Sequence, residues 1–295
     1  MINRKKVVIG ALVADAMALG PHWIYDSKKL KDNFYPIEGL TNPLDDSFHK
    51  NKTKGDFTHL GDQLILLIEF LEKNRKFNRK DFLIKFKKWH KDYSGYKDKA
   101  MKKTIKNIDD KKFIGSSSDE FSGIKVLPIL YYYYGNDSEL LKLNIKKLIK
   151  STHNNDFVIE LGNFFIDLLK EVEKGVLPSK GIENIKGKFS NKINKHIMKA
   201  KKNLEKDTIK SINLLGQSCS SEVAFPSTIY LLLKYETSFE KAILKNILAG
   251  GDSAARGIII GAILAQYHEI DKIPKDWINN INKINYIKKI LNINL

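Results

Sequence analysis

The sequence predicts an all-α fold in which many helices form a single compact domain. Apolar residues recur with helical spacing, as Leu64, Leu67, Ile68 and Leu71 do at positions i, i+3, i+4 and i+7. No segment shows the alternation of apolar and polar residues that is typical of a strand. The 295 residues include only 7 prolines, so long stretches are free to form helices. Helices without a sheet bury their apolar faces against one another, which favours an all-α globule.

The first predicted helix spans residues 7–19, which are apolar and follow a basic start. These features imitate a signal peptide, but Asp15 lies in the middle of the stretch and the turn at Gly20 and Pro21 follows it directly. We therefore expect a buried helix. The same helical spacing predicts further helices over residues 64–71, 82–89, 125–134, 157–173, 225–234, 239–248 and 256–267.

Two segments interrupt this pattern. Residues 33–59 contain two prolines and two glycines, so we expect a long loop, and long loops in compact domains are often functional. Residues 174–210 are rich in lysine and are expected to form a peripheral helical excursion. Neither segment has the composition of an interdomain linker, so residues 1–295 are predicted to form one domain.

The basic composition bears on the choice of partner. Lys and Arg number 51 against 34 Asp and Glu, a formal net charge of +17. Because the lysines are dispersed over polar helix faces rather than clustered among aromatic residues, we expect no nucleic-acid partner. The single cysteine, Cys219, excludes an intrachain disulfide, and no apolar run reaches the roughly 20 residues that span a bilayer. We expect a cytoplasmic protein with no membrane partner.

Two acidic residues stand where predicted helices begin. Asp252 follows Gly250 and Gly251, and Asp62 follows Gly61 just ahead of the helix over residues 64–71. Each carboxylate can either cap its own helix or bind a cation. Because Mg²⁺ prefers oxygen ligands, Asp62 and Asp252 are candidates for a shared ion.

Other polar residues are candidates to line a cleft. Asp15 lies inside an apolar helix and needs a hydrogen-bond partner, either as a strut between loops or as part of a polar pocket with His22. Ser117 and Ser118 lie in a polar loop that forms either a simple turn or a set of donors for phosphate or ribose. His153, ahead of a long helix, belongs to a helix cap or hydrogen-bonds a ligand hydroxyl.

A series of motifs, taken in order, resembles the ADP-ribosylglycohydrolase family. The series covers nearly the whole chain and consists of Asp15-Ala16-Met17-Ala18-Leu19-Gly20, Gly61-Asp62-Gln63, the serine loop with Lys125 and Pro128, Thr152-His153-Asn154, Gly250-Gly251-Asp252, and Ile273-Pro274 with Trp277. The resemblance implies an all-α fold with a central cleft that binds two divalent ions and cleaves the glycosidic bond of ADP-ribose.

The chain departs from the family pattern at both metal motifs. The resemblance implies Thr-Asp-Asp-Thr at the first, where the chain has Leu60-Gly61-Asp62-Gln63, and Gly-Gly-Asp-Thr-Asp-Thr at the second, where Asp252-Ser253-Ala254-Ala255 stands. One carboxylate is missing from each motif, so we expect at most one Mg²⁺ ion, held by Asp62 and Asp252 as the catalytic pair. Arg256 adds a cation beside the second motif and is a candidate to bind a substrate phosphate.

Two functions follow from these features. The first is a hydrolase that cleaves a glycosidic bond to ADP-ribose or a related nucleotide sugar, with ADP-ribose or an ADP-ribosylated protein as its partner. The alternative is a catalytically inactive member of the crystallin-J1-like branch, which binds a nucleotide or ADP-ribose or serves as a structural protein. The reduced set of acidic ligands favours the alternative, and the order of the motifs favours the hydrolase.

Overall fold

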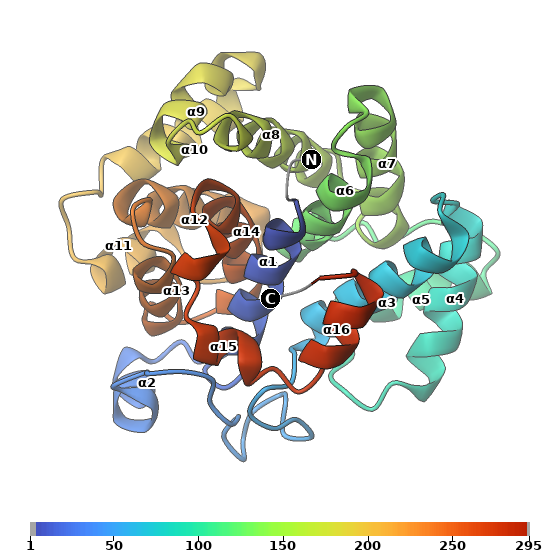
Figure 1. Ribbon diagram of the computed structural model, residues 1–295, viewed down its shortest axis with the longest axis horizontal. Coiled ribbons are helices and arrows are strands. Elements are labelled where there is room, and N and C mark those ends of the chain that lie inside the picture. The colour runs from blue at the N-terminus through green and yellow to red at the C-terminus, as the bar shows by residue number, and fades with distance from the viewer. Residues whose placement is uncertain (1–3, 294–295) are drawn as a thin grey trace.

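Two helices from opposite ends of the chain form the core of the fold. The computed structural model describes residues 4–293, in which α1 (Lys5–Ala18) packs along α14 (Ser253–Tyr267) (Figure 1). From Lys6 onward every residue of α1 is buried, which confirms the predicted buried helix. The two backbones approach closely because each helix has a glycine at the contact. A Cβ atom at Gly10 would lie 2.3 Å from the carbonyl oxygen of Gly261.

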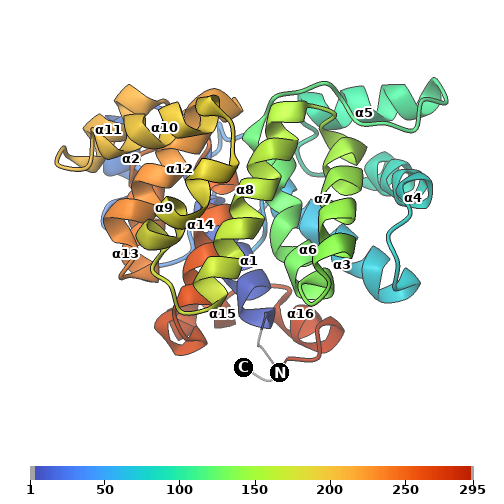
Figure 2. The same ribbon diagram turned by 90° about the horizontal axis from the view of Figure 1, so that it is seen from above.

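The other helices surround this pair. Those in contact with α1 or α14 include α3 (His59–Asn74), α6 (Leu127–Tyr134), α8 (Asp156–Glu173), α12 (Ser221–Tyr235), α13 (Phe239–Leu248) and α15 (Lys275–Asn279). One flank contains α4 (Arg79–Asp92), α5 (Lys99–Asp109) and α7 (Ser138–Thr152), and the opposite flank contains α9 (Pro178–Ile185), α10 (Asn191–Lys201) and α11 (Thr208–Leu215) (Figure 2). The remaining elements are α2 (Ser27–Phe34), α16 (Ile284–Ile290) and three short 3-10 helices, η1 (Phe121–Val126), η2 (Lys186–Lys188) and η3 (Ile270–Lys272).

The all-α prediction is confirmed, since residues 4–293 form helices and no strand. Six predicted helices match α3, α4, α8, α12, α13 and α14, and residues 125–134 begin in η1 and continue as α6. The sequence did not predict α5 or α7, although α5 buries Met101 and Ile108 and α7 buries Leu141, Ile145, Leu148 and Ile149. No helix in the described part of the chain is long and apolar enough to cross a bilayer.

The predicted long loop is also confirmed. Residues 35–58 contain no helix and connect α2 to α3. Backbone contacts hold the loop in place, because the amide of Asn282 donates to the carbonyl oxygen of Gly55 at 2.9 Å. The loop carries His49, whose side chain is buried even though most of its neighbours are not. A buried histidine in an exposed loop shows that the loop turns inward at this residue.

The close contact of α1 and α14 makes Gly10 intolerant of a side chain. We expect Gly10→Ala to lower the free energy of unfolding by about 1–3 kcal/mol, because the added methyl group meets backbone rather than a flexible side chain. Urea unfolding measures the change. Gly187→Ala is the matched control, since a Cβ atom there has no neighbour within 4 Å. Equal stabilities of the two variants would contradict the packing described.

Candidate functional site

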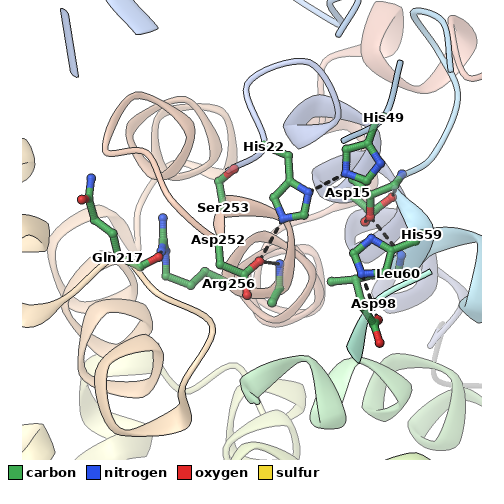
Figure 3. A network of polar contacts seen from close by, with 12 residues as sticks. Asp15, His22, His49, His59, Leu60, Asp98, Gln217, Asp252, Ser253 and Arg256 are labelled. Atoms are coloured by element: carbon green, nitrogen blue, oxygen red, sulfur yellow. Dashed lines mark hydrogen bonds and ion pairs between the residues drawn. The ribbon is translucent and has the colours of Figure 1, made fainter. Parts of the chain in front are cut away.

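Three buried histidines from three separate segments meet beside the start of α14. His22 lies in the turn after α1, His49 comes from the loop over residues 35–58, and His59 is the first residue of α3. Nδ1 of His22 lies 2.8 Å from Nε2 of His49, and one nitrogen of each histidine lies within 4.8 Å of the others (Figure 3). The histidines therefore form one cluster of nitrogen atoms.

Two carboxylates hold this cluster from outside. Nε2 of His22 donates to Oδ1 of Asp252 at 3.0 Å, and Nε2 of His59 lies 3.1 Å from Oδ2 of Asp98 (Figure 3). Each carboxylate also caps a helix, because Asp252 accepts the amide of Ala255 and Asp98 accepts the amide of Met101. The same two aspartates thus fix both helix starts and imidazole rings.

Burial and hydrogen bonding set the charges of this cluster. Burial lowers the pKa of both His22 and His49, so these imidazoles are neutral. Burial opposes ionisation of Asp98 and Asp252. The hydrogen bond from the adjacent histidine, a backbone hydrogen bond and nearby positive charges together outweigh this effect and keep the pKa of each carboxyl below its usual value. Both aspartates are ionised at neutral pH.

Aromatic rings cover the cluster on one side. The ring of Trp23 stacks on that of His22, with centroids 4.2 Å apart, and Tyr96 packs edge-on against Trp23 and His59. Trp23 has a φ of 63°, a left-handed conformation that is rare for a bulky residue. Its amide donates to Gly251 at 2.9 Å, and the amide of Gly251 donates to Ile24 at 2.9 Å. These two bonds attach the turn carrying His22 and Trp23 to the start of α14.

A cavity of about 200 Å³ opens beside these residues. It combines aromatic rings, three carboxylates, a lysine and a thiol, and its lining residues are Trp23, His59, Leu60, Tyr96, Asp98, Lys99, Glu120, Ser122, Cys219 and Asp252. Burial raises the pKa of the Cys219 thiol to about 12, so this cysteine is a neutral thiol at neutral pH. Negatively and positively charged side chains therefore line the same small cavity.

Asp15 lies behind the cavity and acts on it through α3. Its carboxylate accepts the Thr58 amide at 2.9 Å and the Thr58 hydroxyl at 2.6 Å. Thr58 in turn caps α3, whose first residue is His59. A Cβ atom at position 61 would lie 2.2 Å from Oδ2 of Asp15, which explains why Gly61 is a glycine. Two roles were considered for Asp15, a structural strut between loops and part of a polar pocket. These hydrogen bonds are those of a structural strut.

The structure does not bring Asp62 and Asp252 into one cavity. Asp62 lines a separate cavity of about 820 Å³, where it accepts hydrogen bonds from Lys52 and from the hydroxyl of Tyr93 at 2.7 Å. Lys283 also lies 3.6 Å from this carboxylate. Asp252 lies in the smaller cavity with the histidines. The two carboxylates predicted to share a Mg²⁺ ion therefore have different neighbours.

Arg256 is completely buried beneath the start of α14. Its Nε donates to Oδ1 of Asn246 at 2.9 Å, and its Nη2 donates to the carbonyl oxygen of Gly250 at 2.5 Å. A third bond, from Nη1, reaches the carbonyl oxygen of Gln217 at 3.4 Å. The guanidinium group thus fixes the turn at Gly250 and Gly251 from inside and has no exposed surface for a phosphate.

The other predicted residues surround the cavity without lining it. His153 is buried behind it, with Nε2 3.3 Å from Oγ of Ser122 and 3.7 Å from Oε2 of Glu120. Ser118 accepts the amide of Glu120 at 3.3 Å, and Ser117 is exposed. His153 and Ser118 therefore position Glu120 and Ser122, which do line the cavity.

Comparison with known proteins identifies the family. The sequence profile of the ADP-ribosylglycohydrolases matches residues 4–294. The chain belongs to the ADP-ribosylglycohydrolase family. It is 22% identical to Crystallin J1A of Tripedalia cystophora, over 96% of this chain and 93% of that protein, and 22% identical to Crystallin J1B of the same organism, over 93% and 90%.

A solved structure supports the fold. The chain matches an "ADP-ribosylglycohydrolase-related protein complex" with a TM-score of 0.75 and 14% identity, over 98% of this chain and 95% of that one. At this identity the match establishes the arrangement of helices only. Membership of a glycohydrolase family supports a hydrolase-type activity in general.

Members of the ADP-ribosylglycohydrolase family generally bind metal ions. The donor atoms of this site can therefore be compared with the ligands that each class of metal prefers. Mg²⁺ requires several oxygen ligands in octahedral geometry. Here Asp98 and Asp252 are hydrogen-bonded to histidines, Asp62 forms an ion pair with Lys52, and the atoms that converge are imidazole nitrogens. The residues present do not suit Mg²⁺, whereas three imidazoles can hold an ion of another class.

Sequence reasoning missed His49, His59, Asp98 and Glu120 as site residues. One signal for His59 was available. The family pattern Thr-Asp-Asp-Thr begins with threonine, and if Thr58 is taken as that residue, His59 occupies the first acidic position. Asp98 belongs to no motif in the sequence, and Glu120 was not singled out within the serine loop. The contact of Asp98 with His59 and the packing of η1 against α3 place them at the cavity.

Asp15 makes stability depend on pH. Burial raises its pKa to about 6 from 3.8, so the folded protein holds this proton more tightly than the unfolded chain does. Stability should therefore fall as pH rises from about 4 to 6, by on the order of 3 kcal/mol for two pKa units. We expect this fall to be smaller by that amount in Asp15→Asn. Urea unfolding of both proteins at pH 4, 5, 6 and 7 measures the difference, and parallel profiles would contradict the assignment.

Arg256 should act on stability rather than on ligand binding. Its removal in Arg256→Met leaves the Asn246 side chain and three backbone carbonyls without their donor, so we expect a loss of about 3 kcal/mol or more in unfolding free energy. Thermal and urea unfolding measure this loss. Unchanged stability together with lost ADP-ribose affinity would instead identify Arg256 as a phosphate-binding residue.

Proposed function

We propose that the histidine-lined cavity binds the ribosyl part of ADP-ribose or a related nucleotide sugar and that the protein hydrolyses its glycosidic bond. One observation carries this proposal: Asp98, Glu120 and Asp252 converge with Trp23 and Tyr96 on a single cavity. Hydrolysis of a glycosidic bond requires a carboxylate to activate water and an acid to protonate the leaving group. Family membership supports the hydrolase class of this reaction.

We assign the activation of water to Asp252. The hydrogen bonds from His22 and Ala255 both reach Oδ1, which leaves Oδ2 for a water molecule. Because the bond from His22 keeps the pKa of Asp252 low, this group is ionised and able to accept a proton. Glu120 belongs to a different element, has a side chain that is 20% exposed and is the candidate to protonate the leaving group. These roles extend the predicted catalytic role of Asp252.

The cavity size limits which part of the ligand it encloses. About 200 Å³ is less than the 300–1,000 Å³ typical of sites for whole drug-sized ligands, so the ribosyl group and the scissile bond fit inside and the rest lies outside. Trp23 and Tyr96 offer rings on which a base can stack. Lys99, at the start of α5, offers a positive charge to a pyrophosphate. The acceptor can be a small molecule or an ADP-ribosylated protein.

The predicted Mg²⁺ ion at Asp62 and Asp252 is not part of this proposal. These carboxylates lie in different cavities, and Asp62 is held by Lys52 and Tyr93. A second candidate function rests on the similarity to two proteins named crystallins. In that case the cavity binds a nucleotide, or is only structural, and catalyses nothing.

Asp252→Asn separates these functions. The amide oxygen of Asn can still accept the Ala255 amide, so the helix cap is retained, but the side chain can no longer accept a proton from water. We expect hydrolysis of an ADP-ribosylated peptide to fall by about 100-fold or more. The affinity for ADP-ribose should change by about 10-fold or less, because the substitution weakens one charge-assisted hydrogen bond to the ligand. Chromatography of released ADP-ribose and calorimetric titration measure the two quantities.

Tyr286→Phe is the matched control, because this residue does not line the cavity and its hydroxyl donates to Glu69. It should hydrolyse the substrate and bind ADP-ribose like the wild type. Binding without hydrolysis in the wild type would support the inactive branch. Failure of the wild type to bind ADP-ribose, with or without divalent metal, would exclude both a hydrolase and a nucleotide-binding role and leave a structural protein.

A further inference from the structure

We infer that His22, His49 and His59 form a binding site for one transition-metal ion of the Zn²⁺ class. The site adjoins the cavity of the proposed function but does not depend on the hydrolysis proposed there. Three nitrogen donors converge from three segments, and the oxygen donors around them are engaged in hydrogen bonds. This is the donor set of a His-liganded transition metal and not of Mg²⁺.

The spacing of the nitrogens is close to that of a tetrahedral site. Zn–N bonds of about 2.0–2.1 Å place neighbouring ligand nitrogens about 3.3 Å apart. In the cluster, Nδ1 of His22 and Nε2 of His49 are 2.8 Å apart, and the nitrogens of all three residues lie within 4.8 Å of one another. Small side-chain rotations therefore suffice to bring the three donors to bonding distance.

Two of the histidines are already oriented for a metal. Ligand histidines usually donate their second ring N–H to a carboxylate, which fixes the tautomer and turns the other nitrogen toward the ion. Nε2 of His22 faces Asp252 and Nε2 of His59 faces Asp98. When Nε2 of each ring donates to its carboxylate, the lone pair of the neutral imidazole is on Nδ1. Carboxylate partners at two of three ligands are characteristic of a metal site.

An unsatisfied atom gives independent support. Nδ1 of His59 is buried and has no hydrogen-bond partner among the described residues. A buried polar atom without a partner costs on the order of 1–3 kcal/mol. A metal ion between the three rings would supply the missing partner, because Nε2 of the same ring is already held by Asp98.

The surroundings also match a site with an open position. Three protein ligands leave one tetrahedral position for water or a ligand oxygen, as in many catalytic zinc sites. His59 lines the cavity, so this position can face the space where a ligand would bind. Trp23 covers the cluster, with its ring centroid 4.2 Å from that of His22 and 5.3 Å from that of His59, and shields the rings.

Titration of the chelator-stripped full chain with Co²⁺ and Zn²⁺ tests this inference. We expect one ion per chain, visible absorption bands of tetrahedral Co²⁺, a rise in melting temperature and an affinity for Zn²⁺ at least 100-fold higher than for Mg²⁺. His49→Gln and His59→Asn should each weaken Zn²⁺ binding by about 100-fold or more. Asp98→Asn keeps an acceptor for the Met101 amide and should weaken it by about 10–100-fold.

One control variant removes a metal-binding side chain outside the cluster and the cavity. His196→Gln deletes an imidazole that contacts Glu222. This variant should bind Zn²⁺ as the wild type does. The inference is overturned if stripped wild-type protein binds no Zn²⁺, or if binding persists unchanged in the His49, His59 and Asp98 variants. If circular dichroism shows that a histidine variant does not fold, the Zn²⁺ affinity of Asp98→Asn decides whether the metal site exists.

Parallel titration with ADP-ribose separates this inference from the proposed function. Zn²⁺ binding without any ADP-ribose binding would support the metal site and overturn the proposed function. ADP-ribose binding and hydrolysis by a protein that takes up no Zn²⁺ would overturn the metal site and support the function.

Discussion

The close packing of α1 against α14 is the constraint on which the rest of the structure depends. The contact of Gly10 with Gly261 lets the backbones of these helices meet. The end of α1 is then held beside the start of α14, where the backbone bonds between Trp23, Ile24 and Gly251 form. Through those bonds, His22 reaches Asp252 although 229 residues separate them in the sequence.

Charged groups beneath the surface hold the same region from inside. Arg256 donates to four acceptors near the turn at Gly250, and Asp15 accepts two bonds from Thr58. Neither charge contacts the cavity, yet each fixes a helix start that carries a site residue. A buried charge of this kind is expensive to place in a core, and its partners offset the cost only in one geometry. Both groups thereby specify where α3 and α14 begin.

The apolar spacing predicted α3, α8 and α14, each of which buries many large apolar residues. It did not predict α5 or α7, which are rich in lysine and lie on the flank of the fold. The site was harder, because its residues come from helix starts and loops whose meeting depends on tertiary packing. His22 and Asp252 were found through their motifs. His49 lies in a loop without a motif or a helical pattern, and nothing in the sequence shows that this loop turns inward.

The turn at Trp23 has a further consequence for motion in the site. Because this turn shares two backbone hydrogen bonds with Gly251, the segment carrying His22 and Trp23 and the segment carrying Asp252 move as one rigid unit. His49 and Tyr96 lie on segments outside that unit. The geometry between His22 and Asp252 is therefore set by main-chain bonds on both sides, so substitution of a neighbouring side chain leaves the two segments joined.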